Sequence, residues 1–301
     1  MTPLQMLESL KDHLDAPDEF WSNEQLWRRL SDAQQEVIRD ITGEDPSFFV
    51  QTYDISFVSG QATYSLPQNA QLGTRIIFAE NRVGQQGSEV PPADLREMLS
   101  FTQPGVVNLS EYYHFALEGG KVRVLPTPGS SGASAIRIYF IPSYGHMMQG
   151  TASAGGTNTL TFFASDPNWT TNFGWRDVRN DFYNGMQVLI YEGTSAGDVR
   201  MITDYVGGST YQITVDEDWT STPDTTSKFA IMCPVPEQHH QTVVLNAALK
   251  ASIKGRTRDR ELHRAYYGHA GAPGALKDLL SWVGKRQDAR IETVKPVDVG
   301  A

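Results

Sequence analysis

Two stretches far apart in the chain decide the fold: SNEQLWRRLSDAQQEVIRDI at residues 22–41 and QHHQTVVLNAALKASIK at residues 238–254. The apolar residues of the first stretch recur every three or four positions and are Leu26, Leu30, Ala33, Val37 and Ile41. This spacing predicts one apolar face of an amphipathic helix. Neither helix is long enough to be stable alone in water, so each must bury that face. We therefore predict that the two helices pack against each other.

Local signals set the limits of these helices. Ser22 followed by Gln25 forms a capping-box pattern, and Gly43 is a typical helix end. An earlier helix is expected after Thr2 and Pro3, because four leucines follow at helical spacing: Leu4, Leu7, Leu10 and Leu14. In the second stretch a narrow face of small residues allows close helix approach and consists of Val244, Ala247, Ala248 and Ala251. The glycines between residues 268 and 274 are expected to break the helix. Residues 276–282 could extend it beyond this break.

The sequence between the two helices is typical of β-strands and turns. Strands are predicted from their β-branched and aromatic content at residues 48–57, 62–66, 75–80, 112–118, 121–125 and 135–141. Residues 91–99 can hold one short helical turn. Gly119 and Gly120 separate two of the strands, which predicts a β-hairpin with a glycine turn.

Residues 145–230 differ in composition, being rich in Gly, Thr, Ser and Asp and poor in Lys. Short strands at regular spacing with turn signals between them are typical of a small β-sandwich or barrel. We predict an α+β fold with an inserted β-domain at 145–230. The helical and β frame would then be discontinuous, comprising 1–144 and 231–290, and 291–301 would form an extended C-terminal tail.

Charge is unevenly distributed along the 301 residues, whose net charge is −10. Residues 1–236 hold 14 basic and 28 acidic side chains, whereas residues 237–301 hold 11 basic and 7 acidic ones. An acidic chain is a poor general binder of nucleic acids, because binding depends on phosphate contacts. The basic end is open to two interpretations, a solvated helical face or a docking surface for an acidic partner.

The sequence also limits where the protein works. Its single cysteine, Cys233, excludes an internal disulfide and suits a reducing cytoplasm. No stretch approaches 18 apolar residues, so we expect no membrane span. The first residues lack the basic and apolar regions of a signal peptide.

Three motifs could in principle supply catalytic or metal-binding residues, but a structural interpretation is favoured for each. The pattern G-x-S-x-G at 193–197 resembles a nucleophile elbow around Ser195, but a strand rather than a helix follows it, which favours a hairpin turn. The histidines lack the spacing of a zinc site and are His239, His240, His263 and His269. An acidic loop with Asp216, Asp218 and Asp224 lacks the pattern of an EF-hand, so a solvated turn is favoured over a cation site. We therefore expect no catalytic residues, no metal and no cofactor.

The inserted region is dense in aromatic residues, which are Trp169, Phe173, Trp175, Phe182, Tyr183 and Trp219. Such residues most often fill the core of a small β-domain. Exposed tryptophan and tyrosine can instead form a protein contact or a sugar-binding platform. All three interpretations stay open at this point.

Several stretches resemble the head-to-tail adaptor, or connector, proteins of tailed bacteriophages. FWSNEQLWRRLSDAQQE at 20–36 is similar to their opening helix, and GQATYSLP at 60–67 is similar to a turn frequent in phage connector and virion proteins. VLPTP at 124–128 resembles a strand that ends in a proline pair, and Ala247 with Ala248 resembles their C-terminal helix. Fragments between residues 182 and 224 look like a small β-module of phage structural proteins. The long β content departs from the smaller, mainly helical adaptors.

The resemblance implies a structural virion protein at the head–tail junction, assembled in the host cytoplasm. Such adaptors form a ring, here expected to have twelve subunits, beneath the portal vertex. The portal protein would bind one face and tail-tube, nozzle or completion proteins the other. Double-stranded DNA would pass through the lumen without sequence-specific binding. The tail from Ile291 to Ala301 would reach into a portal groove.

The basic end supplies the predicted residues of portal or inter-subunit contact. They are Lys250, Lys254, Arg256, Arg258, Arg260, Arg264, Lys285, Arg286, Arg290 and Pro296. Two rival hypotheses remain. One is a tail-completion or tail-accessory virion protein whose β-domain binds a neighbouring protein or a host glycan, and the other is a hydrolase that uses Ser195.

Overall fold

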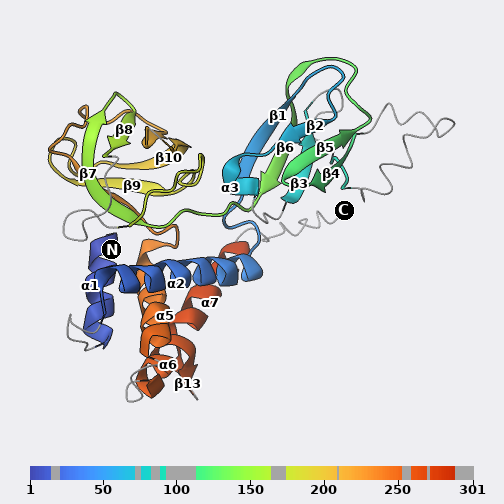
Figure 1. Ribbon diagram of the computed structural model, residues 1–301. Helices are drawn as coiled ribbons and strands as arrows, with labels where there is room; N and C mark the ends of the chain where they lie inside the picture. The colour runs from blue at the N-terminus through green and yellow to red at the C-terminus, as the bar shows by residue number, and fades with distance from the viewer. Residues whose placement is uncertain are drawn as a thin grey trace, which may run out of the picture.

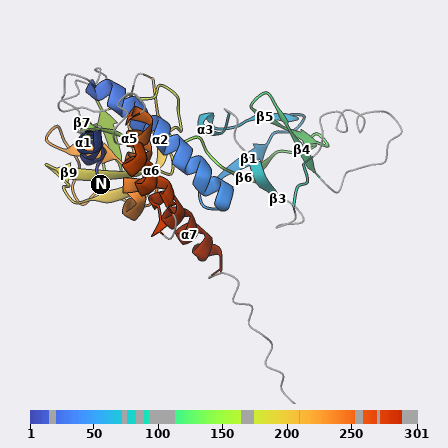
Figure 2. The same cartoon turned by 90° about the horizontal axis from the view of Figure 1, so that it is seen from below.

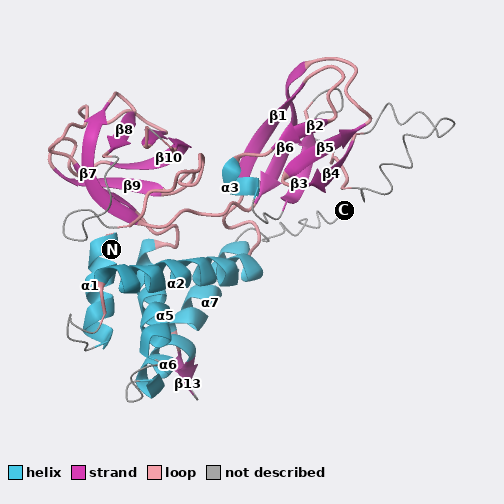
Figure 3. Ribbon diagram, viewed as in Figure 1, coloured by secondary structure: helices cyan, strands magenta, loops and turns pink. Residues whose placement is uncertain are grey.

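A computed structural model describes residues 1–14, 21–71, 76–82, 89–92, 113–163, 174–208, 210–252, 259–269 and 272–288. Helices gather at one end of the molecule and two strand-rich units lie above them (Figures 1 and 3). The predicted α+β fold is therefore confirmed, and the helical, β1–β6 and barrel parts are described in turn below.

Five α-helices form the helical end: α1 (Pro3–Leu14), α2 (Asn23–Glu44), α5 (His240–Ser252), α6 (Asp259–Tyr267) and α7 (Ala275–Asp288). A short 3-10 helix, η1 (Glu237–His239), precedes α5. The helix α2 lies across α5 and α7, and α1 packs on α5 (Figures 1 and 2). The predicted packing of the two distant helical stretches is thus confirmed. As expected, the helix is interrupted after residue 267. The short strands β13 (Gly268–His269) and β14 (Ala272–Pro273) separate α6 from α7.

The capping box of α2 forms as predicted. The Gln25 backbone N–H donates to Ser22 Oγ at 3.2 Å, and the Ser22 N–H donates to Gln25 Oε1 at 3.2 Å. These two bonds satisfy backbone donors that the first helical turn leaves without partners. At the other end the helix continues through Gly43 to Glu44, one residue further than predicted.

The β1–β6 unit consists of two three-stranded antiparallel sheets. One sheet has the order β1-β6-β3 and the other the order β2-β5-β4. Their strands are β1 (Gln51–Phe57), β2 (Thr63–Ser65), β3 (Ile76–Asn81), β4 (His114–Glu118), β5 (Lys121–Leu125) and β6 (Gly132–Phe140), and a short helix α3 (Gln68–Gln71) follows β2. The β4–β5 hairpin confirms the predicted glycine turn: Gly119 and Gly120 have φ of 54° and 81°, where only glycine fits easily. Strand β1 begins later than predicted, and the turn expected near residue 95 falls outside the described residues.

The remaining strands close into a six-stranded barrel of order β10-β11-β8-β7-β12-β9. They are β7 (Met148–Gly155), β8 (Thr159–Phe162), β9 (Gln187–Glu192), β10 (Val199–Val206), β11 (Gln212–Val215) and β12 (Lys228–Ile231). Of the two predicted architectures, sandwich or barrel, the structure has the barrel. The boundaries at 144/145 and 230/231 stay a prediction.

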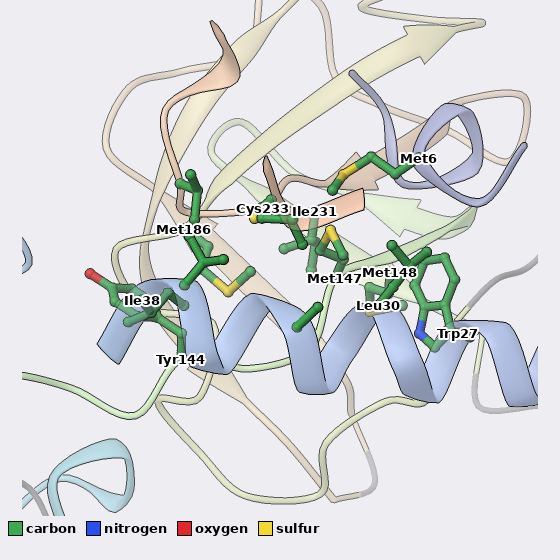
Figure 4. Close-up of a cluster of buried hydrophobic side chains, with 14 of the residues drawn as sticks. Met6, Trp27, Leu30, Ile38, Tyr144, Met147, Met148, Met186, Ile231 and Cys233 are labelled. Carbon is green, nitrogen blue, oxygen red and sulfur yellow. The ribbon is translucent and has the colours of Figure 1, made fainter. Parts of the chain in front are cut away.

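Buried apolar residues form two separate clusters within the described part of the chain. One cluster lies inside the β1–β6 unit and includes Phe57, Val122 and Ile136. The other runs without a break from the helices into the barrel. Figure 4 shows Trp27 and Leu30 of α2 beside Met148 of β7, and Ile38 of the same helix beside Met186, which precedes β9. The barrel and the helical end therefore share one core.

The β1–β6 unit meets the barrel through polar contacts. The Gln68 N–H of α3 donates to Asp181 Oδ2 at 3.1 Å, and Gln51 Nε2 donates to the Asn184 carbonyl at 2.6 Å. Between the two units the chain passes along α2, where Gln34 Nε2 donates to the Gly145 carbonyl at 2.9 Å. Within the described residues, no helix is long and apolar enough to cross a membrane.

His146, in the same segment along α2, is expected to make the stability of the protein depend on pH. Burial lowers its pKa below the ordinary value of 6.5, and its Nδ1 is buried with no hydrogen-bond partner among the described residues. Below about pH 6.5 the unfolded chain therefore binds more protons than the folded one, so acid destabilises the fold. We expect His146→Gln to reduce the loss of unfolding free energy between pH 7.5 and 5.5 by up to about 1 kcal/mol, measured by urea unfolding. An identical pH dependence in both proteins would contradict this assignment.

Candidate contact surfaces of the C-terminal helices

The structure places five of the ten predicted contact residues. Lys250 lies in the last turn of α5, Arg260 and Arg264 on α6, and Lys285 and Arg286 in the last turns of α7. The other five lie outside the described residues and are Lys254, Arg256, Arg258, Arg290 and Pro296. The role of these ten residues in contacts with other proteins stays a prediction.

Lys250 takes part in a polar network inside the helical end. Its Nζ lies 2.6 Å from Glu36 Oε2, and Asn246 Nδ2 donates to the same oxygen at 2.8 Å. The hydrogen bond from Lys250 holds the pKa of Glu36 below its usual value. The Asn246 amide also donates to Tyr266 Oη at 3.2 Å. This network ties α5 to α2 and α6, so Lys250 already has a structural partner within the chain.

Arg286 is held in an aromatic cluster. Its guanidinium lies 4.9 Å from the centre of the Phe48 ring and 5.5 Å from that of Trp282, and the two rings meet edge to face. Cation–π contacts of this kind stabilise by about 0.5–1 kcal/mol at exposed sites. The cluster fixes the end of α7 to the segment just before β1, a contact that no local sequence pattern indicated.

Arg260, Arg264 and Lys285 are exposed. On α6 the positions 260, 264 and 267 follow helical spacing, so Arg260, Arg264 and Tyr267 share one stripe. The Tyr267 side chain is 52 % exposed. Among the predicted contact residues that the structure places, Arg260, Arg264 and Lys285 are therefore the best situated to meet another protein.

An open groove of about 550 Å³ runs beside α7, and we call it the α7 groove. It is lined by Glu44, Tyr267, Leu276, Lys277, Leu280, Ser281, Gly284 and Lys285. Leu276, Leu280 and Gly284 recur every four residues and form an apolar stripe along the helix. Lys277 belongs to this surface although the sequence prediction omitted it; the spacing of the two leucines was the signal that could have indicated it.

The candidate catalytic and metal-binding motifs of the sequence have structural roles. Ser195 lies in the β9–β10 turn, where its Oγ donates to the Ser221 carbonyl, and strand β10 follows directly. The predicted hairpin turn is therefore confirmed. His240 is buried with Nε2 2.9 Å from the Val235 carbonyl oxygen. Asp224 Oδ1 accepts hydrogen bonds from the N–H and hydroxyl of Thr226, within its own turn. The described residues contain no group of three potential metal ligands.

The aromatic residues of the barrel mostly serve its core. Phe182, Tyr183 and Trp219 are buried, as the core interpretation predicted. Trp175 is partly buried against the core, with the Arg28 guanidinium 5.3 Å from its ring centre. Trp169 and Phe173 lie outside the described residues.

The helical frame carries two β units and presents exposed surfaces on α6 and α7 that are suited to contacts with other proteins. The family model of the SU10 adaptor protein matches residues 1–167, more than half of the chain, and the chain belongs to this family. It is therefore a bacteriophage adaptor and a structural component of the virion, in a family that is not one of enzymes. A search of the curated proteins found no match.

Proposed function

We propose that this protein is a head-to-tail adaptor that forms a ring beneath the portal vertex, joins the portal to the tail and lines the DNA exit channel. The observation that carries the proposal is the family match, which spans α1, α2, the whole β1–β6 unit and the first two strands of the barrel. The portal protein would bind one face of the ring, and tail-tube, nozzle or completion proteins the other. Twelve copies are proposed, with assembly in the host cytoplasm.

The charge of the chain supports passage of DNA through such a ring. A net charge of −10 disfavours adhesion of a phosphate backbone, whose contacts with cations supply most of the binding energy. Double-stranded DNA could then slide through the lumen without sequence-specific contacts. The basic residues are concentrated at the C-terminal end, which suits a protein partner with acidic side chains.

Among the placed basic residues, we propose Arg260, Arg264 and Lys285 as the main contacts with the portal or a neighbouring subunit. They are exposed, whereas Lys250 and Arg286 already make contacts within the chain. The tail 291–301 is proposed to reach into a groove of the portal. The alternative, an accessory protein with a sugar-binding barrel, gains no support from Phe182, Tyr183 and Trp219, because all three are buried.

The proposal is tested by mixing the purified protein with its cognate portal and examining the complex by electron microscopy. We expect rings of the adaptor on the portal. The variant lacking residues 291–301 should attach more weakly, with its melting temperature unchanged, because it keeps every residue of α1, α2 and α5–α7.

Two results would count against these statements. Full-length protein that never associates with the portal would refute the adaptor function in this form. Unchanged attachment of the shortened variant would refute the role of the tail alone. An Arg39→Ala variant, altered at an exposed site on α2, serves as the control for non-specific loss of binding.

A further inference from the structure

The α7 groove combines an apolar floor with two lysines and one acidic residue, Glu44. Leu276 and Leu280 are half-buried, and the exposed Tyr267 ring stands at the α6 side. Lys277 and Lys285 border the groove and are both exposed. Arg264 lies one helical turn before Tyr267 on the same stripe of α6. Such a surface suits a partner that offers apolar side chains flanked by carboxylates.

The barrel carries a surface of that kind, which we call the barrel patch. On β10 the side chains of Val199 and Met201 are 46 % and 37 % exposed. Asp216 lies directly beside them, because its Oδ1 accepts a hydrogen bond from the Met201 N–H at 2.9 Å. Glu217 and Asp218 follow, and all three acidic residues are exposed. The barrel patch therefore combines two apolar side chains with one adjacent carboxylate, and the next two residues in the chain are also acidic.

The two surfaces lie on different parts of the molecule: the barrel is at the top of Figure 1 and α6 and α7 are at the bottom. They differ in charge and share an apolar centre, so they are complementary. A contact between unlike patches of two copies is heterologous, and heterologous contacts generate closed rings when the rotation between copies closes.

We propose that the barrel patch of one copy docks in the α7 groove of the next copy. This inference rests on the proposed ring and specifies how its subunits meet. Val199 and Met201 cover Leu276 and Leu280, while Glu217 and its neighbours face Lys277 and Lys285. Because these charges border an exposed contact, salt weakens the association.

The first test reverses one charge on each surface. Glu217→Lys and Lys285→Glu each weaken self-association by at least about ten-fold, because like charges then face each other across the contact. An equimolar mixture of the two variants restores it, since the reversed patch of one meets the reversed groove of the other. Sedimentation velocity measures this, with Glu8→Lys on α1 as a control of equal charge change. Single variants that associate like the wild type, or a mixture that restores nothing, would overturn the contact.

The second test separates this contact from the adaptor function. A Met201→Cys and Leu280→Cys variant is bound to the portal and treated with a short bis-maleimide linker. Covalent multimers are expected on a denaturing gel, and the wild-type Cys233 is buried and gives none. Portal-bound protein without multimers would overturn the contact and leave the adaptor function intact. Protein that does not bind the portal at all would count against the adaptor function itself.

Discussion

The Trp27→Ala variant is expected to lose about 3–5 kcal/mol of unfolding free energy, the usual cost of removing a fully buried tryptophan. Trp27 is completely buried in α2, in the cluster that joins the helices to the barrel. Removing it leaves a cavity in the core at that junction. The loss is measured by urea unfolding, with Arg39→Ala on the same helix as a control expected to change stability by less than about 0.5 kcal/mol.

Hydrogen exchange tests whether the helices and the barrel open as one cooperative unit. Amides of α2, α5, β7 and β12 should lose protection together in the Trp27→Ala variant, because they open as one cooperative unit. Amides of β5 and β6 should keep theirs, since the β1–β6 unit has a core of its own. Loss of protection in the helices alone would show that the barrel is stabilised independently.

The second large effect is expected at Asn246, which connects three helices. Its side chain is buried and donates to Glu36 of α2 and to Tyr266 of α6. Asn246→Ala should cost about 1–3 kcal/mol, because it leaves buried polar groups without partners. Lys250→Met should cost less than about 1 kcal/mol, since the ion pair with Glu36 is partly exposed.

Unfolding in urea at pH 7 compares these two variants. A greater loss for Lys250→Met than for Asn246→Ala would contradict this description of the network. If the expected order is found, Lys250→Met can also be used to test portal binding without a confounding loss of fold.

Local signals predicted most elements of this fold. The Ser22 capping box, the Gly119–Gly120 turn and the four-residue spacing of α2 each depend on residues close together in sequence, so the pattern itself contains the information. The mutual packing of α2 and α5 followed from their need to bury apolar faces. The sequence could not decide between a β-sandwich and a barrel, because closure of the sheet depends on which distant strands pair.

The contact surfaces were less accessible to sequence reasoning. Counting basic residues selected Lys250 and Arg286, but the partners that engage them, Glu36 and Phe48, lie more than 200 residues away in sequence. The same count omitted Lys277, whose importance comes from the groove formed where α7 meets Tyr267 and Glu44. A residue's exposure is a property of the packed structure, so composition alone cannot rank these candidates.

The unequal attachment of the two β units has a mechanical consequence. Pulling the barrel away from α2 would expose apolar side chains such as Met148 and Leu30, which is energetically unfavourable. A force applied to the barrel is therefore transmitted to the helices. The β1–β6 unit is joined to the barrel by hydrogen bonds such as Gln68 to Asp181, which water can replace at little cost. A virion subunit built in this way resists tension along one path and yields along the other.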